Sequence, residues 1–154
     1  MILAATCVLI IATYLMMIDR KGISTDEGMR MAIINGGQQY EPSGVSPDAT
    51  WPNVLETNSA NAYQPLYFLI QNTLMRLTGR QNDLFFRSVN VGFLALCLAG
   101  LITLSNRWPT TSRLFLLGLF SFNAFLFMHV LQIREYIVGL AFYIWSTWFV
   151  LRLQ

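Results

Sequence analysis

The stretch VNVGFLALCLAGLITL, residues 89–104, contains no Asp, Glu, Lys or Arg. Apolar runs of this kind are typical of membrane-spanning helices, in which the backbone amides bond to one another because lipid offers them no partner. The run is near the short end of what crosses a bilayer, so flanking residues have to reach into the interface. We therefore predict a membrane span here and an all-α fold.

Three more uncharged apolar runs accompany this one, at residues 2–18, 114–130 and 136–151. The whole chain is 55% hydrophobic and only 12% charged, whereas soluble domains carry about 25% charged residues. Together the runs predict a polytopic membrane helix bundle with about four transmembrane helices. The formal net charge of +2 gives no reason to expect a nucleic acid partner.

A long polar loop, residues 19–87, separates the first two spans and holds every acidic residue except Glu135. Within it, Ser24 and Glu27 have the spacing of a helix capping box, in which each side chain bonds to the backbone N–H of the other. This pattern predicts a short helix over about 25–35, and the two glycines that follow would end it.

The rest of the loop divides into an irregular part and a second helix. Residues 40–61 are rich in Pro, Gly, Ser, Asn and Asp, so we expect no regular structure there. Residues 65–78, PLYFLIQNTLMRLT, start with a proline suited to a first helical turn. A helix of this length reaches only about 21 Å, and it carries Gln71, Asn72 and Arg76. We expect it to lie at the membrane surface; the alternative is a fifth span, which would invert everything downstream.

Positive charges in the short connections predict the orientation. Arg107 and Arg113 lie between the second and third runs without an acidic neighbour, and Arg152 follows the fourth run. Such connections are usually cytoplasmic. We therefore expect a multi-pass protein of the cell's inner or plasma membrane, with its N-terminus inside and loop 19–87 outside.

Two neighbouring carboxylates, Asp26 and Glu27, are the first candidates for catalysis. They would stand at the start of a helix just outside the membrane, where a carboxylate can take a proton from a hydroxyl group. Acidic residues in a first helical turn also complement the helix dipole, and Glu27 has the capping position. Both interpretations stay open on spacing alone, and Asp26 is the freer of the two.

Arg134, with Tyr136, is the second candidate, because an arginine at the end of a span is costly unless it is paired. Its planar group suits a phosphate, although it could instead pair with Glu135 or with lipid headgroups. Arg87 could be another phosphate contact or an interfacial anchor. His129 is the single histidine, and we assign it no catalytic role.

The chain resembles the N-terminal part of GT-C superfamily glycosyltransferases, in the branch of the protein O-mannosyltransferases and aminoarabinose transferases. Four motifs carry the resemblance, in the family's order: an Asp-Glu pair after the first span, a Pro-Leu-Tyr motif, an arginine before the second span, and an Arg-x-Tyr motif after the third. The matching segments are DEGMRMAIINGG (26–37), QPLYFLIQNTLMRLTG (64–79), LFFRSVNVGFLALCLAGLITL (84–104) and IREYIVGLAFYIWSTWFVLR (133–152).

The resemblance implies transfer of a sugar from a polyprenyl-phosphate donor to an acceptor hydroxyl on the extracytoplasmic face. Asp26 matches the catalytic acid position and Glu27 its neighbour. Membrane lipid and the lipid-linked sugar would be the partners, with no cofactor assigned and the need for a divalent metal left open. The substrate-binding positions would be Gln64, Tyr67, Arg87, Arg134 and Tyr136.

Two departures from the family leave other functions open. Gln64-Pro65 stands where the family has a proline pair, without the basic residue that often precedes it. Family members also have further spans, so we expect this chain to be a fragment of a longer protein or a reduced protein without activity. The alternatives are another membrane enzyme of polysaccharide assembly and a small non-catalytic membrane subunit.

The expected orientation can be tested by labelling single cysteines in a variant without Cys7 and Cys97. A cysteine at Ser46 should react with a membrane-impermeant reagent in intact cells, and one at Thr110 should react only after lysis, because the arginine-rich connections stay inside. The reverse pattern would show that the orientation is wrong.

Overall fold

The computed structural model describes residues 1–18, 25–37, 49–61 and 65–153, without the side chains of residues 25, 26, 60 and 61. The part of the chain so described is all-helical, as expected, and contains no strand. Its helices are α1 (Ile2–Met17), α2 (Thr25–Ile34), α3 (Trp51–Asn61), α4 (Pro65–Thr78), α5 (Asp83–Leu104), α6 (Thr110–Ser121), α7 (Ala124–Val130) and α8 (Tyr136–Leu153).

Two helices are long and apolar enough to cross a membrane, α5 with 22 residues and α8 with 18. The pair α6 and α7 passes the same test together, although the two helices are bent by 62° at the break between them. Counting that pair gives three candidate spans. The apolar helix α1 has 16 residues, and it falls below the length that spans a bilayer unaided.

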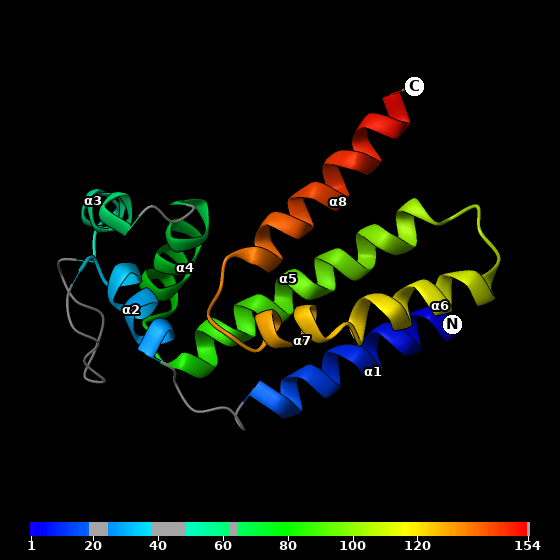
Figure 1. Ribbon diagram of the computed structural model, residues 1–154, viewed down its shortest axis with the longest axis horizontal. Coiled ribbons are helices and arrows are strands. Elements are labelled where there is room, and N and C mark those ends of the chain that lie inside the picture. Colours follow the sequence, from blue (N-terminus) through cyan, green and yellow to red (C-terminus); the bar gives the residue numbers. More distant parts are fainter. Residues whose placement is uncertain (19–24, 38–48, 62–64, 154) are drawn as a thin grey trace.

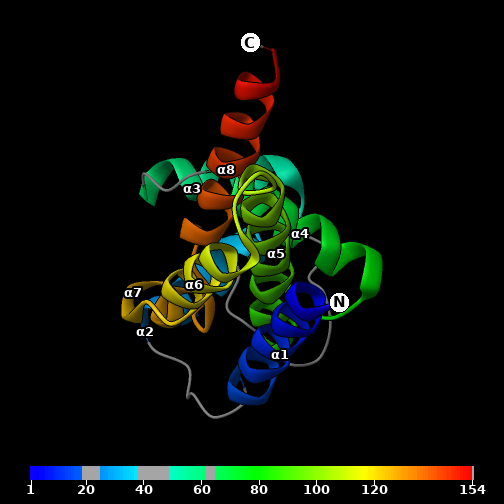
Figure 2. The same cartoon turned by 90° about the vertical axis from the view of Figure 1, so that its right-hand side faces the viewer.

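The long helices lie side by side, and α2, α3 and α4 gather at one end of them (Figure 1). Helices α1 and α6 run toward that end, whereas α5 and α8 run away from it. Helix α1 lies against both α5 and α6 (Figure 2). The Tyr14 hydroxyl donates a 2.6 Å hydrogen bond to the backbone oxygen of Ser121, which fixes α1 to α6.

Helices α5 and α8 make the most extensive contact between elements. Gly100 lets them approach closely, since a Cβ atom there would lie 2.5 Å from Cγ2 of Ile144. One turn earlier on α5, the backbone oxygen of Leu96 accepts a 3.1 Å hydrogen bond from Nε1 of Trp145. Small residues at helix contacts of this kind are typical of membrane proteins.

The third apolar run, predicted as a span over 114–130, is not one helix but is divided into α6 and α7. Asn123 is the residue that starts the second part: its Oδ1 accepts hydrogen bonds from the backbone N–H of Phe125 at 2.9 Å and of Leu126 at 3.3 Å. Asparagine favours this N-cap position because its side chain replaces a missing backbone partner. The hydrophobic pattern does not show the break.

The helix starts also differ from expectation elsewhere. Helix α5 begins at Asp83, six residues before the apolar run, with Asn82 as its N-cap accepting from Phe85 N–H at 2.9 Å. Helix α3 lies within the stretch 40–61 where we expected no regular structure, and residues 38–48 lie outside the described part. The expected bounds of α2 and α4 are confirmed to within one residue.

Polar side chains of α4 face the interior of the α2–α4 group. Asn72 is fully buried, and its Nδ2 donates to the backbone oxygens of Ile34 at 2.9 Å and Ala49 at 2.8 Å. These bonds join α4 to the end of α2 and to the residues before α3. Polar residues distinguish α4 from an ordinary membrane-spanning helix, and they hold α2, α3 and α4 together.

The close approach of α5 and α8 at Gly100 predicts that a larger residue there lowers the stability of the protein. Gly100→Ala should lower the thermal stability of the protein in detergent, because the added methyl group must displace the β-branched side chain of Ile144. Gly92→Ala is the matched control in the same helix, where a Cβ atom meets nothing within 4 Å. Equal melting midpoints for the two variants would contradict this account of the contact.

Candidate functional site

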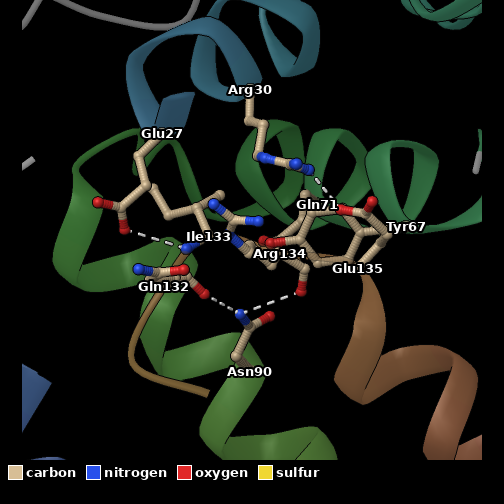
Figure 3. A network of polar contacts seen from close by, with 9 residues as sticks. All are labelled: Glu27, Arg30, Tyr67, Gln71, Asn90, Gln132, Ile133, Arg134 and Glu135. Atoms are coloured by element: carbon tan, nitrogen blue, oxygen red, sulfur yellow. Dashed lines mark hydrogen bonds and ion pairs between the residues drawn. The ribbon is translucent and has the colours of Figure 1, made fainter. Parts of the chain in front are cut away.

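The connection between α7 and α8, residues 131–135, meets α2, α4 and α5 at the end of the molecule that carries α2–α4 (Figure 3). Helices α2, α4 and α5 each contribute side chains at this place. The side chains that meet here are buried and polar, which is unusual for a protein of this composition. Their contacts decide what the site can do.

Glu27 of α2 and Arg87 of α5 form the centre of the contact. Both side chains are fully buried, and Oε1 of Glu27 lies 3.3 Å from a terminal nitrogen of Arg87. The same Oε1 accepts a 3.1 Å hydrogen bond from the backbone N–H of Ile133. Arg87 also donates to the backbone oxygen of Ile18 at 2.9 Å. One ion pair thus connects α1, α2, α5 and the α7–α8 connection.

Arg30 and Glu135 form a second buried ion pair, one helical turn along α2 from the first. Residues three positions apart lie on the same face of a helix, so Glu27 and Arg30 both point at the α7–α8 connection. Two carboxylates and two guanidinium groups balance one another here. Removing one member of such a set leaves an uncompensated buried charge.

Asn90 of α5 holds the same connection from the opposite side. Its Nδ2 donates to the backbone oxygen of Gln132 and, at 3.4 Å, to that of Arg134 (Figure 3). The Ile133 N–H donates to Glu27, and the Glu135 carboxylate accepts from Arg30. The backbone on both sides of Arg134 is therefore fixed by side chains from two helices.

Helix α4 joins the network through Tyr67 and Gln71. Nε2 of Gln71 donates to the Tyr67 hydroxyl and to the backbone oxygen of Phe86, both at 3.2 Å. Burial raises the pKa of Tyr67 well above its ordinary value, so its hydroxyl stays neutral at physiological pH. Tyr67 is thus a buried hydroxyl in the polar network, and it carries no charge there.

The structure brings several of the sequence-predicted site residues into one place. Glu27, Tyr67 and Arg87 are fully buried, so none of them contacts solvent in this conformation. Glu27 pairs with Arg87, and the Tyr67 hydroxyl accepts a hydrogen bond from Gln71. A substrate contact by Arg87 would require α2 and α5 to part. The capping role expected for Glu27 involves Ser24, which lies outside the described residues; the Glu27 carboxylate contacts Arg87 and the Ile133 N–H.

Two predicted residues fall outside what the structure describes. Gln64 lies in the undescribed stretch 62–64, and Asp26 is described only as part of the α2 backbone. Asp26 directly precedes Glu27, and Arg134 directly follows Ile133. The Glu27–Ile133 hydrogen bond therefore joins the helix that contains Asp26 to the segment that contains Arg134.

Tyr136, at the start of α8, differs from the other predicted residues in being 46% exposed. Its ring lies 4.6 Å from that of His129 between centroids, and His129 lies 4.0 Å from Phe125. These rings line a mostly apolar groove of about 670 Å³ between α6, α7 and α8. Arg134, two residues before Tyr136, is half-buried.

Arg30 and Asn90 were missed in the sequence analysis. Asn90 could have been found because a polar side chain inside an apolar run usually has a specific partner. Arg30 lies three residues after Glu27, which places it on the same helix face. Among the described residues no cluster of three or more His, Cys, Asp or Glu could hold a metal ion.

Breaking the ion pair between Glu27 and Arg87 is expected to lower the free energy of unfolding. Glu27→Gln keeps the size of the side chain but removes the negative charge beside the buried Arg87, whose distance to the Asp83 carboxylate is 3.8 Å. Breaking a buried pair in this way typically costs about 3–5 kcal/mol of unfolding free energy. Denaturant unfolding in detergent measures the loss.

Asp83→Asn is the matched control for Glu27→Gln. It removes the same charge from the same arginine, but the Asp83 side chain is 26% exposed, and exposed pairs contribute about 0–1 kcal/mol. If both variants lose equally little stability, the buried pair does not hold the structure together.

Comparisons of this chain with family models, with curated proteins and with solved structures found no match.

Proposed function

We propose that this chain is a membrane module of an inverting glycosyltransferase that uses a polyprenyl-phosphate sugar donor. The single observation in support is the hydrogen bond from Ile133 N–H to Glu27. It joins the Asp-Glu motif to the Arg-x-Tyr motif across 106 positions of the sequence. Two motifs that the resemblance assigns to one active site thus adjoin in the fold.

The proposed reaction uses one residue from each motif. Asp26 accepts the proton of the acceptor hydroxyl while that oxygen forms a bond to the anomeric carbon of the sugar. The bond from the anomeric carbon to the phosphate oxygen breaks on the opposite face, so the configuration inverts. The electron pair leaves on the lipid phosphate, where the guanidinium group of Arg134 stabilises the growing negative charge.

The buried ion pairs would act as the support of such a site. A base and a phosphate-binding group accelerate a reaction only if their separation is kept close to the productive geometry. Glu27, Arg30 and Asn90 fix the backbone beside Asp26 and Arg134 with buried contacts. In this proposal Glu27 and Arg87 are positioning residues, and they do not touch the substrate.

The groove beside Tyr136 provides room for an apolar ligand near Arg134. It is lined largely by Leu and Phe side chains from α6, α7 and α8. A polyprenyl chain is apolar along its whole length, so it gains from leaving the polar headgroup region for such a surface. The phosphate at the end of that chain would then lie within the neighbourhood of the Arg-x-Tyr motif.

We further propose that four segments cross the membrane: α1, α5, the bent pair α6 and α7, and α8. Their alternating directions support this arrangement (Figure 1). Arg107, Arg113 and Arg152 belong to the end away from α2–α4, whereas Glu135 and the acidic residues of α2 belong to the other. This orients α2–α4 and the candidate site to the outside of an inner or plasma membrane.

A non-catalytic membrane subunit is the second candidate function, and the burial of the charged residues favours it. Glu27 and Arg87 are both fully buried, and their charges balance. A network of this kind can serve stability and specificity of the fold alone. The two candidates differ in whether Asp26 is needed for a reaction.

Asp26→Asn therefore tests the proposed chemistry. Asn keeps the size and the helix-starting tendency of Asp but cannot accept a proton. The rate of sugar transfer by the purified full-length protein from a polyprenyl-phosphate donor should fall by about 10²–10⁴-fold. Arg134→Lys should also lower the rate, because lysine lacks the planar two-pronged donor.

Glu56→Gln, on the exposed side of α3, is the control and should leave the rate unchanged. The thermal midpoint of Asp26→Asn should equal that of the parent protein, which separates a lost base from a lost fold. A near-normal transfer rate for Asp26→Asn would leave Asp26 as a helix-start residue and favour the subunit.

A further inference from the structure

Residues at the C-terminal ends of α5 and α8 and just after α5 line a cleft. These helix ends lie away from α2–α4 (Figure 1). We propose that this cleft binds an anionic phospholipid, with the lipid phosphate between Arg107 and Arg152. Its volume is about 640 Å³. Its lining includes Leu104, Asn106, Arg107, Trp148, Leu151 and Arg152.

The arginines of this end have few acidic partners in the sequence. Between residues 84 and 154 the single acidic residue is Glu135, and it lies in the buried ion pair with Arg30 at the other end. Arg113 uses one terminal nitrogen to bond the backbone oxygen of Ile102 at 2.9 Å. The lining of the cleft therefore carries two positive charges and no negative one.

Arg152 is held in place before any ligand arrives. Its guanidinium carbon lies 5.1 Å from the centre of the Trp148 ring, and Trp148 packs edge-to-face on Trp145 with centroids 5.6 Å apart. Trp145 in turn is bonded to Leu96 of α5. This stack fixes an arginine at the wall of the cleft, which lowers the entropy lost when an anion binds.

The cleft exists because α5 and α8 touch earlier along their length. Gly100 packs against Ile144 within a distance that leaves no room for a side chain, and the C-terminal end of α8 points away from that of α5 (Figure 1). The cleft is lined by the apolar side chains of Leu104 and Leu151 and by the polar side chains of Asn106 and Arg107.

A lipid fits this cleft better than a free anion does. Leu104 and Leu151 offer apolar surface for the start of an acyl chain, while Arg107 and Arg152 bind the phosphate at headgroup level. Tryptophan is enriched at the same depth of membrane proteins, and basic pockets between transmembrane helices on the cytoplasmic side bind anionic headgroups. The inference requires that α5 and α8 cross a membrane, as their length and composition indicate, and it does not depend on sugar transfer.

Native mass spectrometry of the purified protein tests the proposal directly. In detergent with equal amounts of dioleoylphosphatidylglycerol and dioleoylphosphatidylcholine, the parent protein should retain the anionic lipid preferentially. Arg107→Gln combined with Arg152→Gln should lower that preference by about tenfold or more, since each basic residue near the surface contributes to binding of anionic lipid. The corresponding double lysine variant should keep most of the preference.

Arg76→Gln with Arg80→Gln is the control, because it removes the same charge from exposed positions in and after α4. It should leave the lipid preference unchanged. Inorganic phosphate at the same concentration as the lipid should not displace it. The proposal is overturned if the parent protein shows no preference, if the control loses as much as the test variant, or if inorganic phosphate alone displaces the lipid.

Discussion

The buried ion pair between Glu27 and Arg87 is the interaction on which the rest of this structure depends. Glu27 comes from the segment after the first apolar helix, and Arg87 from the start of α5. Arg87 reaches the end of α1 through Ile18, and Glu27 reaches the α7–α8 connection through Ile133. Neither charge is stable in a buried place without the other. Their pairing therefore selects one arrangement of α2 against the long helices.

This constraint explains why a polar loop of a membrane protein has a defined position. Helix α2 buries the apolar side chains of Met31, Ile33 and Ile34, but hydrophobic burial is non-directional and does not by itself fix one orientation of the helix. Two ion pairs and the hydrogen bonds of Asn72 and Asn90 supply the missing specificity. The backbone around Arg134 is fixed as a consequence, and the fixed segment continues into Tyr136 and the groove between α6, α7 and α8.

Much of the fold could be predicted from the hydrophobic pattern, because uncharged apolar runs have one stable state in a membrane. The all-helical class and the bounds of α4 followed from it. The break at Asn123 could not be predicted, since a single asparagine in an apolar run either bonds to another helix or starts a new one. Helix α3 was missed because its composition is that of a loop, and tertiary contacts such as the hydrogen bond from Trp51 to Thr73 hold it. The sequence named Glu27, Tyr67 and Arg87 as candidates, but their network could not be predicted, because the sequence does not show that Glu27 and Arg87 are buried against each other.

The adjacency of the Asp-Glu and Arg-x-Tyr motifs is the central claim, and chemical cross-linking measures it most directly. Cysteines at Asp26 and Arg134, in a protein without Cys7 and Cys97, should be joined by a short bifunctional thiol reagent in native membranes. A cysteine at Asp26 paired with one at Thr110, which begins α6 at the opposite end, should not be joined. The account predicts an efficient cross-link for the first pair that disappears when Arg87 is replaced. Absence of that cross-link in the folded protein, or equal yields for both pairs, would contradict it.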